Sequence, residues 1–311
     1  MLDGTERLGV LGVTVADERD LERDGGVLGT RLRRFATLAA ELIMTKSRYG
    51  DTLVRLRRRA TMGLAAEMQW SMLPPLTFAC RQVTVAAALE PAYEVAGDSV
   101  DYAVDAGCAR FAVFDGMGHG LESAQLAAVA IAAYRNARRD NRSLTDTAHR
   151  IETAVSTVFR GDAFTTAVVA ELDTDTGLLS WVNAGHPVPL LLRAGRLVKF
   201  LRVEPGLPFG LAQNLPGAPA LVVGTEQLEP GDRVLLYTDG VTDARSPEGE
   251  PFGAQRLVDL LARNIAGGLP VPETMRRVVR SLLEHQQGQL DDDATMLLAE
   301  WRSGDEIKLV P

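Results

Sequence analysis

Residues 109–120 read Ala-Arg-Phe-Ala-Val-Phe-Asp-Gly-Met-Gly-His-Gly, and this stretch decides the fold. The apolar run that ends at Phe114 predicts a buried strand. Asp115 follows the strand directly, and the glycines after it allow a tight loop. The alanine-rich segment 123–139 then predicts a helix. The stretch therefore places a carboxylate where a strand meets a loop.

Three further acidic groups lie at predicted junctions between strand and loop. They are Gly97-Asp98-Ser99-Val100-Asp101 before a strand, Thr238-Asp239-Gly240 after the strand 233–237, and Asp291-Asp292-Asp293 before the strand 295–301. Each group alone is more often a structural turn or a solvated loop than a catalytic group. Asp173 and Asp175 are acidic residues of that ordinary kind, because a hairpin turn accounts for them.

Taken together, the four acidic groups predict a metal site. Hard divalent cations prefer oxygen ligands, and short aspartate side chains on rigid strand ends supply them. Carboxylates gathered in one place repel one another, and cations relieve that repulsion. Two such ions can lower the pKa of a shared water and neutralise a phosphate beside it.

Paired strands dominate the second half of the chain. The runs 165–172 and 178–183 flank a turn sequence, and 189–193 and 197–201 flank Ala194-Gly195. Such hairpins imply antiparallel pairing. With the interleaved helical segments, they predict an α+β fold with two mostly antiparallel sheets covered by helices.

Composition excludes several classes of protein. The net charge of -8 over 311 residues argues against a main role in binding nucleic acid or an anionic membrane. Cys80 and Cys108 form no C-x-x-C pattern, which favours two thiols in a reducing compartment. The sequence shows no secretion signal and no apolar run of the ~20 residues that span a bilayer. We therefore expect a cytoplasmic protein.

The chain divides into three predicted parts. Residues 1–29 form a short segment with a strand at 8–15, residues 30–73 form a long helix, whole or broken, that Pro74 ends, and residues 74–311 form the β-rich domain. Apolar or small residues recur along the helix at heptad steps: Leu32, Phe35, Ala39, Leu42, Tyr49, Leu53, Leu56 and Ala60. This coiled-coil-like seam could pair with a second copy in a homodimer or pack on its own domain.

Eight stretches resemble the bacterial PP2C-like phosphatases of the SpoIIE/RsbU type, within the metal-dependent phosphatase (PPM) superfamily. They are 67–74, 96–101, 114–120, 164–166, 183–187, 206–210, 237–244 and 292–295. The likeness covers roughly residues 67 to 301. It departs from the common pattern at Ala96, where a glycine is usual, and at Ser99 and Val100, which replace aromatic residues. A weaker resemblance links Gly9–Val15 and Leu32–Ile43 to the end of a GAF sensor domain.

The resemblance implies an α-β-β-α sandwich with a dinuclear Mn²⁺ or Mg²⁺ site at one end of the paired sheets. It implies five ligands, namely Asp98, Asp115, Asp239, Asp292 and the carbonyl of Gly116, with Asp115 as the bridge between the ions and Asp293 as the alternative to Asp292. Asp101 and Asp243 would be supporting or helical partners. His119 is either a proton donor to the leaving group or structural, and His186 is expected to fix a loop.

The activity that the resemblance implies is hydrolysis of phosphoserine or phosphothreonine on a protein. The implied substrate is an anti-anti-sigma factor of the STAS type, so that sigma-factor control lies downstream. Two alternatives stay open. One is a catalytically silent module that keeps the fold as a scaffold, and the other is a metal hydrolase of small phosphate esters.

Overall fold

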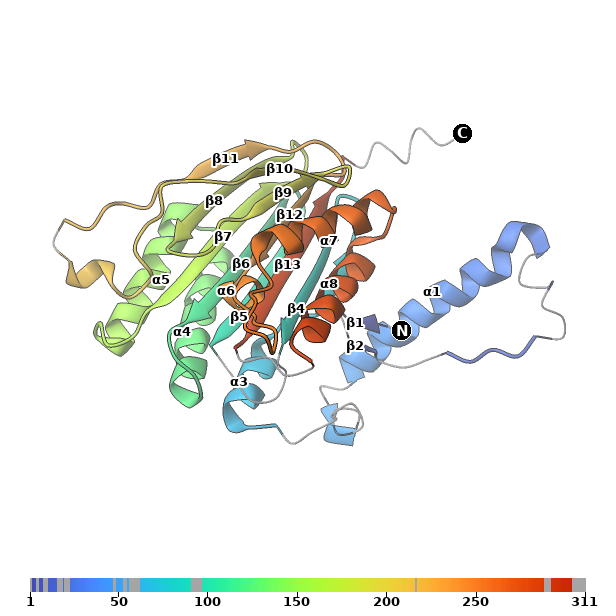
Figure 1. Cartoon of the computed structure of the whole chain (residues 1–311), viewed down its shortest axis with the longest axis horizontal. Helices are drawn as coiled ribbons and strands as arrows, with labels where there is room; N and C mark the ends of the chain where they lie inside the picture. The colour runs from blue at the N-terminus through green and yellow to red at the C-terminus, as the bar shows by residue number, and fades with distance from the viewer. Residues whose placement is uncertain are drawn as a thin grey trace. The chain divides into compact units, whose positions relative to one another are not determined.

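The computed structural model describes residues 2–3, 6–7, 11–15, 19, 23–46, 49–52, 55, 62–90, 97–215, 217–287 and 292–303. The chain divides into two compact units, residues 1–61 and 62–311 (Figure 1). Within the described residues, no helix has both the length and the apolar character needed to cross a membrane.

The first unit contains helix α1 (Arg23–Lys46) and the short antiparallel strands β1 (Leu2–Asp3) and β2 (Glu6–Arg7). Residues 11–15 belong to the predicted strand 8–15, but they form no strand, and residues 8–10 lie outside the described residues. A strand needs a partner for its backbone groups, and no described segment pairs with residues 11–15.

The predicted long helix is broken. Helix α1 begins seven residues earlier than position 30 and ends at Lys46, and a separate helix α3 (Leu64–Met72) belongs to the second unit. Phe35 and Leu42 of the predicted seam are exposed on α1. Leu53, Leu56 and Ala60 lie outside the described residues.

The second unit is built on two sheets. The six-stranded sheet has the order β10 (Arg196–Phe200), β9 (Leu190–Arg193), β12 (Arg233–Tyr237), β13 (Ala294–Trp301), β4 (Val83–Glu90) and β3 (Thr77–Ala79). The five-stranded sheet has the order β11 (Gly224–Gln227), β8 (Leu178–Ala184), β7 (Thr165–Asp173), β6 (Cys108–Gly116) and β5 (Asp98–Asp105). Every neighbouring pair of these strands is antiparallel, as predicted.

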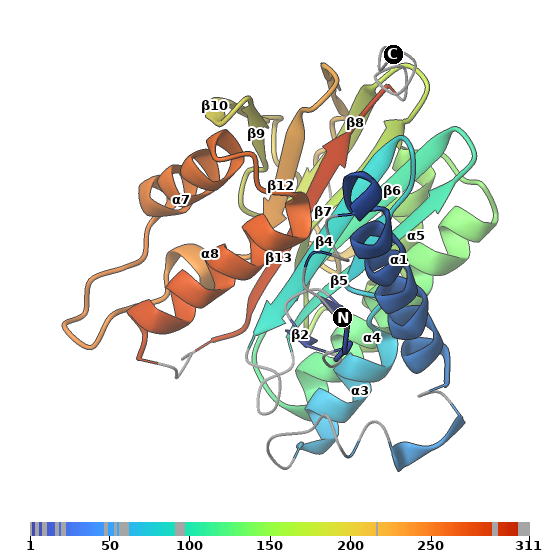
Figure 2. The same ribbon diagram turned by 90° about the vertical axis from the view of Figure 1, so that its right-hand side faces the viewer.

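Helices cover both outer faces. Helices α4 (Leu121–Arg139) and α5 (Leu144–Phe159) pack on the five-stranded sheet, and α7 (Ala254–Ala266) and α8 (Val271–His285) pack on the six-stranded sheet (Figure 2). Helix α3 lies against α4, and two short helices, α6 (Asp239–Thr242) and η3 (Ala212–Asn214), interrupt the loops. The predicted α-β-β-α sandwich is confirmed.

Strand periodicity explains the layers. On β13, Leu297 and Ala299 face the core between the sheets, whereas Met296 and Leu298 face the core under α7 and α8. Successive side chains of a strand point to opposite faces, so a strand between two apolar layers must be apolar at nearly every position. All eight residues of β13 are buried.

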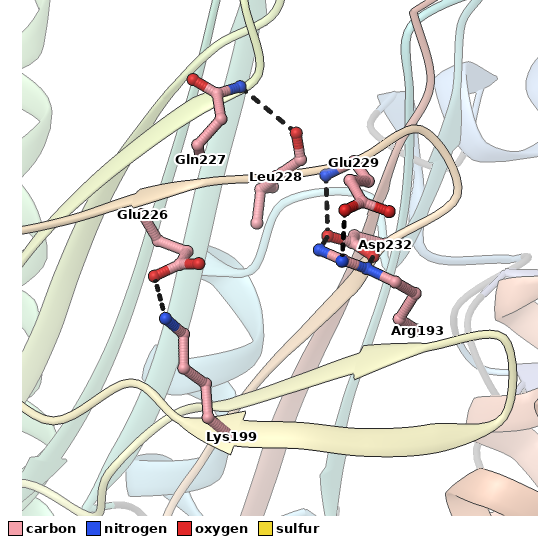
Figure 3. Close-up of polar contacts among 7 residues, drawn as sticks. All are labelled: Arg193, Lys199, Glu226, Gln227, Leu228, Glu229 and Asp232. Carbon is pink, nitrogen blue, oxygen red and sulfur yellow. Dashed lines mark hydrogen bonds and ion pairs between the residues drawn. The ribbon is translucent and has the colours of Figure 1, made fainter.

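Ion pairs close one edge of the sandwich (Figure 3). Lys199 on β10 pairs with Glu226 on β11, and these two strands are the edges of different sheets. On β9, the Nε and Nη2 atoms of Arg193 donate to the two carboxylate oxygens of Asp232 at 2.7 and 2.8 Å. Asp232 is fully buried and also accepts from the backbone N–H of Glu229. The bonds between Arg193 and Asp232 therefore join the end of β9 to the start of β12 at this edge.

We expect Asp232→Ala to lower the free energy of unfolding by about 2–4 kcal/mol, because it removes the bidentate partner of Arg193 and leaves a backbone N–H without an acceptor. Lys199→Ala removes an ion pair whose lysine side chain is 48% exposed, and should cost less than about 1 kcal/mol. Urea unfolding followed by circular dichroism measures both. Equal small losses in the two variants would contradict a structural role for the buried carboxylate.

Candidate metal centre

The two sheets each bring aspartates to the same end. Asp98 begins β5 and Asp115 is the penultimate residue of β6, and the two residues lie directly opposite each other in the antiparallel ladder. Residues opposite each other in such a pair have Cβ atoms about 4.5–5.5 Å apart. The five-stranded sheet therefore supplies one pair of neighbouring carboxylates.

The six-stranded sheet supplies the others. Asp239 opens α6 just after β12 ends, and Asp292 and Asp293 come just before β13 begins. Strands β12 and β13 are antiparallel neighbours, so the end of one meets the start of the other. The ladder continues one step past β12, because the backbone N–H of Thr238 donates to the carbonyl of Thr295 at 3.0 Å.

Hydrogen bonds join the two sheets at this end. The Oδ2 atom of Asp293 accepts from the backbone N–H of Gly97 at 2.9 Å and from that of Asp98 at 3.4 Å. The hydroxyl of Thr238 donates to Oδ2 of Asp98 at 2.7 Å. The carboxylates at positions 98, 115, 239, 292 and 293 therefore gather at a single end of the sandwich.

The carboxylates are close enough to disturb one another. Burial raises the pKa of Asp115 to about 6, with further contributions from the charges of Asp239 and Asp292. Burial also raises the pKa of Asp98 well above its ordinary value, and the charges of Asp115 and Asp293 add to this.

The same holds on the side of the six-stranded sheet. Burial raises the pKa of Asp239, and the charges of Asp243 and Asp292 add to the effect. Burial raises the pKa of Asp293 to about 6 even though the backbone N–H groups of Gly97 and Asp98 favour its ionised form. Mutual repulsion of this kind is what divalent cations relieve.

Two glycines are required by close backbone contacts at the site. A Cβ atom at Gly97 would lie 2.7 Å from the carbonyl oxygen of Gly116, and one at Gly240 would lie 1.9 Å from the carbonyl oxygen of Asp293. Both distances are shorter than a side chain tolerates. The glycines beside Asp98 and Asp239 therefore let strands and loops approach until the carboxylates meet. Ala96, the neighbour that departs from the family pattern, lies outside the described residues.

The ligand chemistry fits a hard cation. The Oδ1 atom of Asp293 is buried without a hydrogen-bond partner among the described residues, so a carboxylate oxygen is left with no partner. Ionised carboxylates only accept, and Mg²⁺ and Mn²⁺ take such oxygens. In the described part of the chain, however, no group of three or more His, Cys, Asp or Glu side chains is arranged so that it could hold a metal ion as it stands.

His119, Asp101 and Asp243, which the sequence analysis placed near the metal site, differ in their surroundings. His119 is exposed, and no hydrogen bond or ion pair within the described chain connects it to the carboxylates. Asp101 is a helical partner, because its buried carboxylate pairs with Arg135 and Arg138 of α4. Asp243 lies next to Asp239, whose pKa it raises.

Sequence reasoning assigned no role to three polar residues that bond the backbone or side chain of predicted ligands. Thr238 bonds Asp98, and the amide of Gln69 on α3 donates to the carbonyl of Asp98 at 2.6 Å. The hydroxyl of Ser123 donates to the carbonyl of Gly116 at 3.3 Å. Ser123 lies seven positions from its partner, but the partners of Gln69 and Thr238 are 29 and 140 positions away. No local pattern could have paired these two.

Solved structures identify the class of fold. The SiaA-PP2C domain of Pseudomonas aeruginosa superposes with a TM-score of 0.63 at 22% identity, covering 76% of this chain and 94% of that domain. The RsbU and RsbW domains of Rv1364c from Mycobacterium tuberculosis give 0.60 at 25% identity, over 71% and 62%. The catalytic domain of the phosphatase PstP, solved with 2 manganese ions, gives 0.50 at 21% identity, over 71% and 99%. The chain has the PP2C-type fold.

The family follows from the sequence comparison. The family described as Stage II sporulation protein E (SpoIIE) matches residues 105–302, and the chain belongs to it. Protein IcfG of Synechocystis sp. is 32% identical over 141 residues, which are 45% of this chain and 21% of IcfG. Phosphoserine phosphatase RsbP of Bacillus subtilis is 25% identical over 70% of this chain and 52% of RsbP. The chain thus spans about a fifth of the length of IcfG and about half of the length of RsbP.

The raised pKa of Asp115 predicts an unusual pH dependence for the chelator-treated protein. With a folded-state pKa of about 6 and an ordinary value near 4, the folded protein holds a proton between these pH values that the unfolded chain has released. This contribution stabilises the fold at low pH and is lost as the pH rises through 6. Asp115→Asn does not titrate, so its thermal midpoint should exceed that of wild type by more at pH 7 than at pH 4.5. A constant difference would contradict the shifted pKa.

Proposed function

We propose that this protein is a metal-dependent serine/threonine phosphatase that hydrolyses phosphoserine or phosphothreonine on a regulatory protein. The observation that carries the proposal is that aspartates from both sheets gather at one end of a PP2C-type fold. Membership of the SpoIIE family, and the name of the relative RsbP, a phosphoserine phosphatase, support it.

We assign the ligand roles to Asp98, Asp115, Asp239, Asp292 and the Gly116 carbonyl, with Asp115 as the bridging residue. Two Mn²⁺ or Mg²⁺ ions, when bound, would lower the pKa of a shared water and neutralise charge on the phosphate. Asp292 is favoured over Asp293 because it lies two positions before Ala294 in the stretch that resembles the family. Asp293, whose Oδ1 has no partner among the described residues, stays the alternative. His119 is exposed at the loop before α4, from where it could reach a leaving group of a bound protein.

The proposed substrate is a phosphorylated anti-anti-sigma factor of the STAS type. Rv1364c has an RsbW domain beside its RsbU domain, which supports a regulatory phosphoprotein as the partner. The two free cysteines are in keeping with a reducing cytoplasm. Neither nucleic acid nor a membrane is part of the proposal.

We expect Asp115→Ala and Asp239→Ala each to reduce manganese-dependent hydrolysis of p-nitrophenyl phosphate at least about 100-fold, because each removes a charge that holds the ions. Circular dichroism should show that the fold persists. Asp105→Asn, at the exposed far end of β5, is the matched control and should retain activity.

Wild-type turnover in either alanine variant would refute the assigned roles. A wild-type protein that binds no Mn²⁺ in a calorimetric titration would favour the silent scaffold instead. Hydrolysis of small esters with no action on any phosphoprotein of the same genome, read by mass spectrometry, would favour the small-ester hydrolase.

We also propose that α1 pairs with a second copy of the chain. Phe35, Leu38 and Leu42 are about 60% exposed, and their spacing of three and four residues places them on one helical face. Leu38→Asp combined with Leu42→Asp should convert a dimer to a monomer in sedimentation velocity. Val158→Asp, at an exposed apolar position on α5, should leave the mass unchanged. A monomeric wild type would refute the pairing.

A further inference from the structure

Asp115 has a neighbour whose role the ligand set does not explain. The hydroxyl of Thr166 on β7 lies 3.5 Å from Oδ2 of Asp115 and 2.8 Å from Nδ1 of His186. Thr166 is directly opposite Asp115 in the β6–β7 ladder. A threonine hydroxyl therefore stands between the carboxylate and a histidine ring.

The histidine is held in place by its own loop. The backbone N–H of His186 donates to Oδ1 of Asn183, and Nδ2 of Asn183 donates to the carbonyl of His186, both at 2.8 Å. Asn183 is buried near the end of β8, and His186 is only 5% exposed. The side chain of Asn183 therefore holds the backbone of the loop, and the ring of His186 contacts Thr166.

The protons of this arrangement can be assigned by counting donors. An ionised carboxylate only accepts, and a hydroxyl has one hydrogen to donate. If Thr166 donates to Asp115, then Nδ1 of His186 must carry the hydrogen that Thr166 accepts. The opposite tautomer would draw the Thr166 hydroxyl toward the ring and leave this oxygen of Asp115 without its donor.

The surroundings of the ring favour a neutral histidine. Burial lowers the pKa of His186 to about 3, so the ring has a single N–H. Its Nε2 atom has no hydrogen-bond partner among the described residues, and the backbone of Tyr237 partly offsets the lowering of the pKa. Because Thr166 is the partner of Nδ1, the relay requires the single N–H of the ring to be on Nδ1.

We propose that Thr166 and His186 are positioning residues that orient the carboxylate of Asp115 for cation binding through the relay Nδ1–H to Oγ1–H to Oδ2. The inference rests on the proposed metal site and deepens it. Groups that hydrogen-bond metal ligands fix the orientation of those ligands. The relay would serve this purpose for the residue proposed to bridge the ions.

The test is calorimetric titration of the whole chain with Mn²⁺ alone. Thr166→Val keeps the shape but removes the hydroxyl, and should weaken Mn²⁺ affinity about 10–100-fold. Thr166→Ser restores the hydroxyl and should recover most of the affinity. His186→Asn keeps a donor near the position of Nδ1 and should bind better than His186→Gln.

The matched control is Thr174→Val, at a threonine just after β7 that is 1% exposed and whose hydroxyl has no partner among the described residues. It should bind Mn²⁺ as wild type does. The rise in thermal midpoint on adding Mn²⁺ gives a second readout, which should be smaller for Thr166→Val than for the control. If Thr166→Val does not fold, the Asn and Gln variants of His186 decide between the two tautomers.

Two failures are distinguishable. A wild-type protein that binds no Mn²⁺ overturns the proposed metal site itself. A wild-type protein that binds Mn²⁺, together with a Thr166→Val variant that binds it equally well, overturns the relay and leaves the metal site standing. Equal affinities for His186→Asn and His186→Gln would contradict the assigned tautomer.

Discussion

Repulsion among carboxylates is the constraint that the second unit must overcome. Asp98, Asp115 and Asp293 are buried enough, and close enough to other negative charges, that their ionised forms are disfavoured. A flexible loop would let such groups move apart. Here each carboxylate lies on or beside a strand that pairs on at least one side, so its position follows from the sheet. The apolar core between the sheets supplies the stability that this arrangement costs.

The cost is reduced by donors aimed at individual oxygens. Asp293 receives two backbone N–H groups from the start of β5, and Asp98 receives the hydroxyl of Thr238. These bonds also cross from one sheet to the other. The same contacts therefore do two things, since they hold the carboxylates in place and align the ends of the sheets. Residues that satisfy such lone pairs are as much a part of the site as the aspartates.

Helix α3 contacts both the site and helix α4. Gln69 reaches the carbonyl of Asp98, and Arg135 on α4 binds both the carbonyl of Met72 and the carboxylate of Asp101. Asp101 and Asp98 are three positions apart on β5, and their carboxylates serve different purposes. Asp101 is neutralised by two arginines, which fixes the helix layer, whereas Asp98 faces other acids. Sequence spacing alone does not separate these two roles.

The sequence by itself determined the layered fold and the identity of the acidic residues. Alternating and continuous apolar runs predict strands such as β6 and β13, and glycines beside Asp98 and Asp239 predict close backbone approach, because both signals are local. Only the tertiary structure decided that α1 and α3 are separate helices and that Asp101 is an ion-pair partner. It also decided that Thr238 and Asp293 hold the start of β5. Those contacts join residues 140 and 195 or more positions apart, and hydrogen-bond partners at such separations leave no periodic trace in the chain.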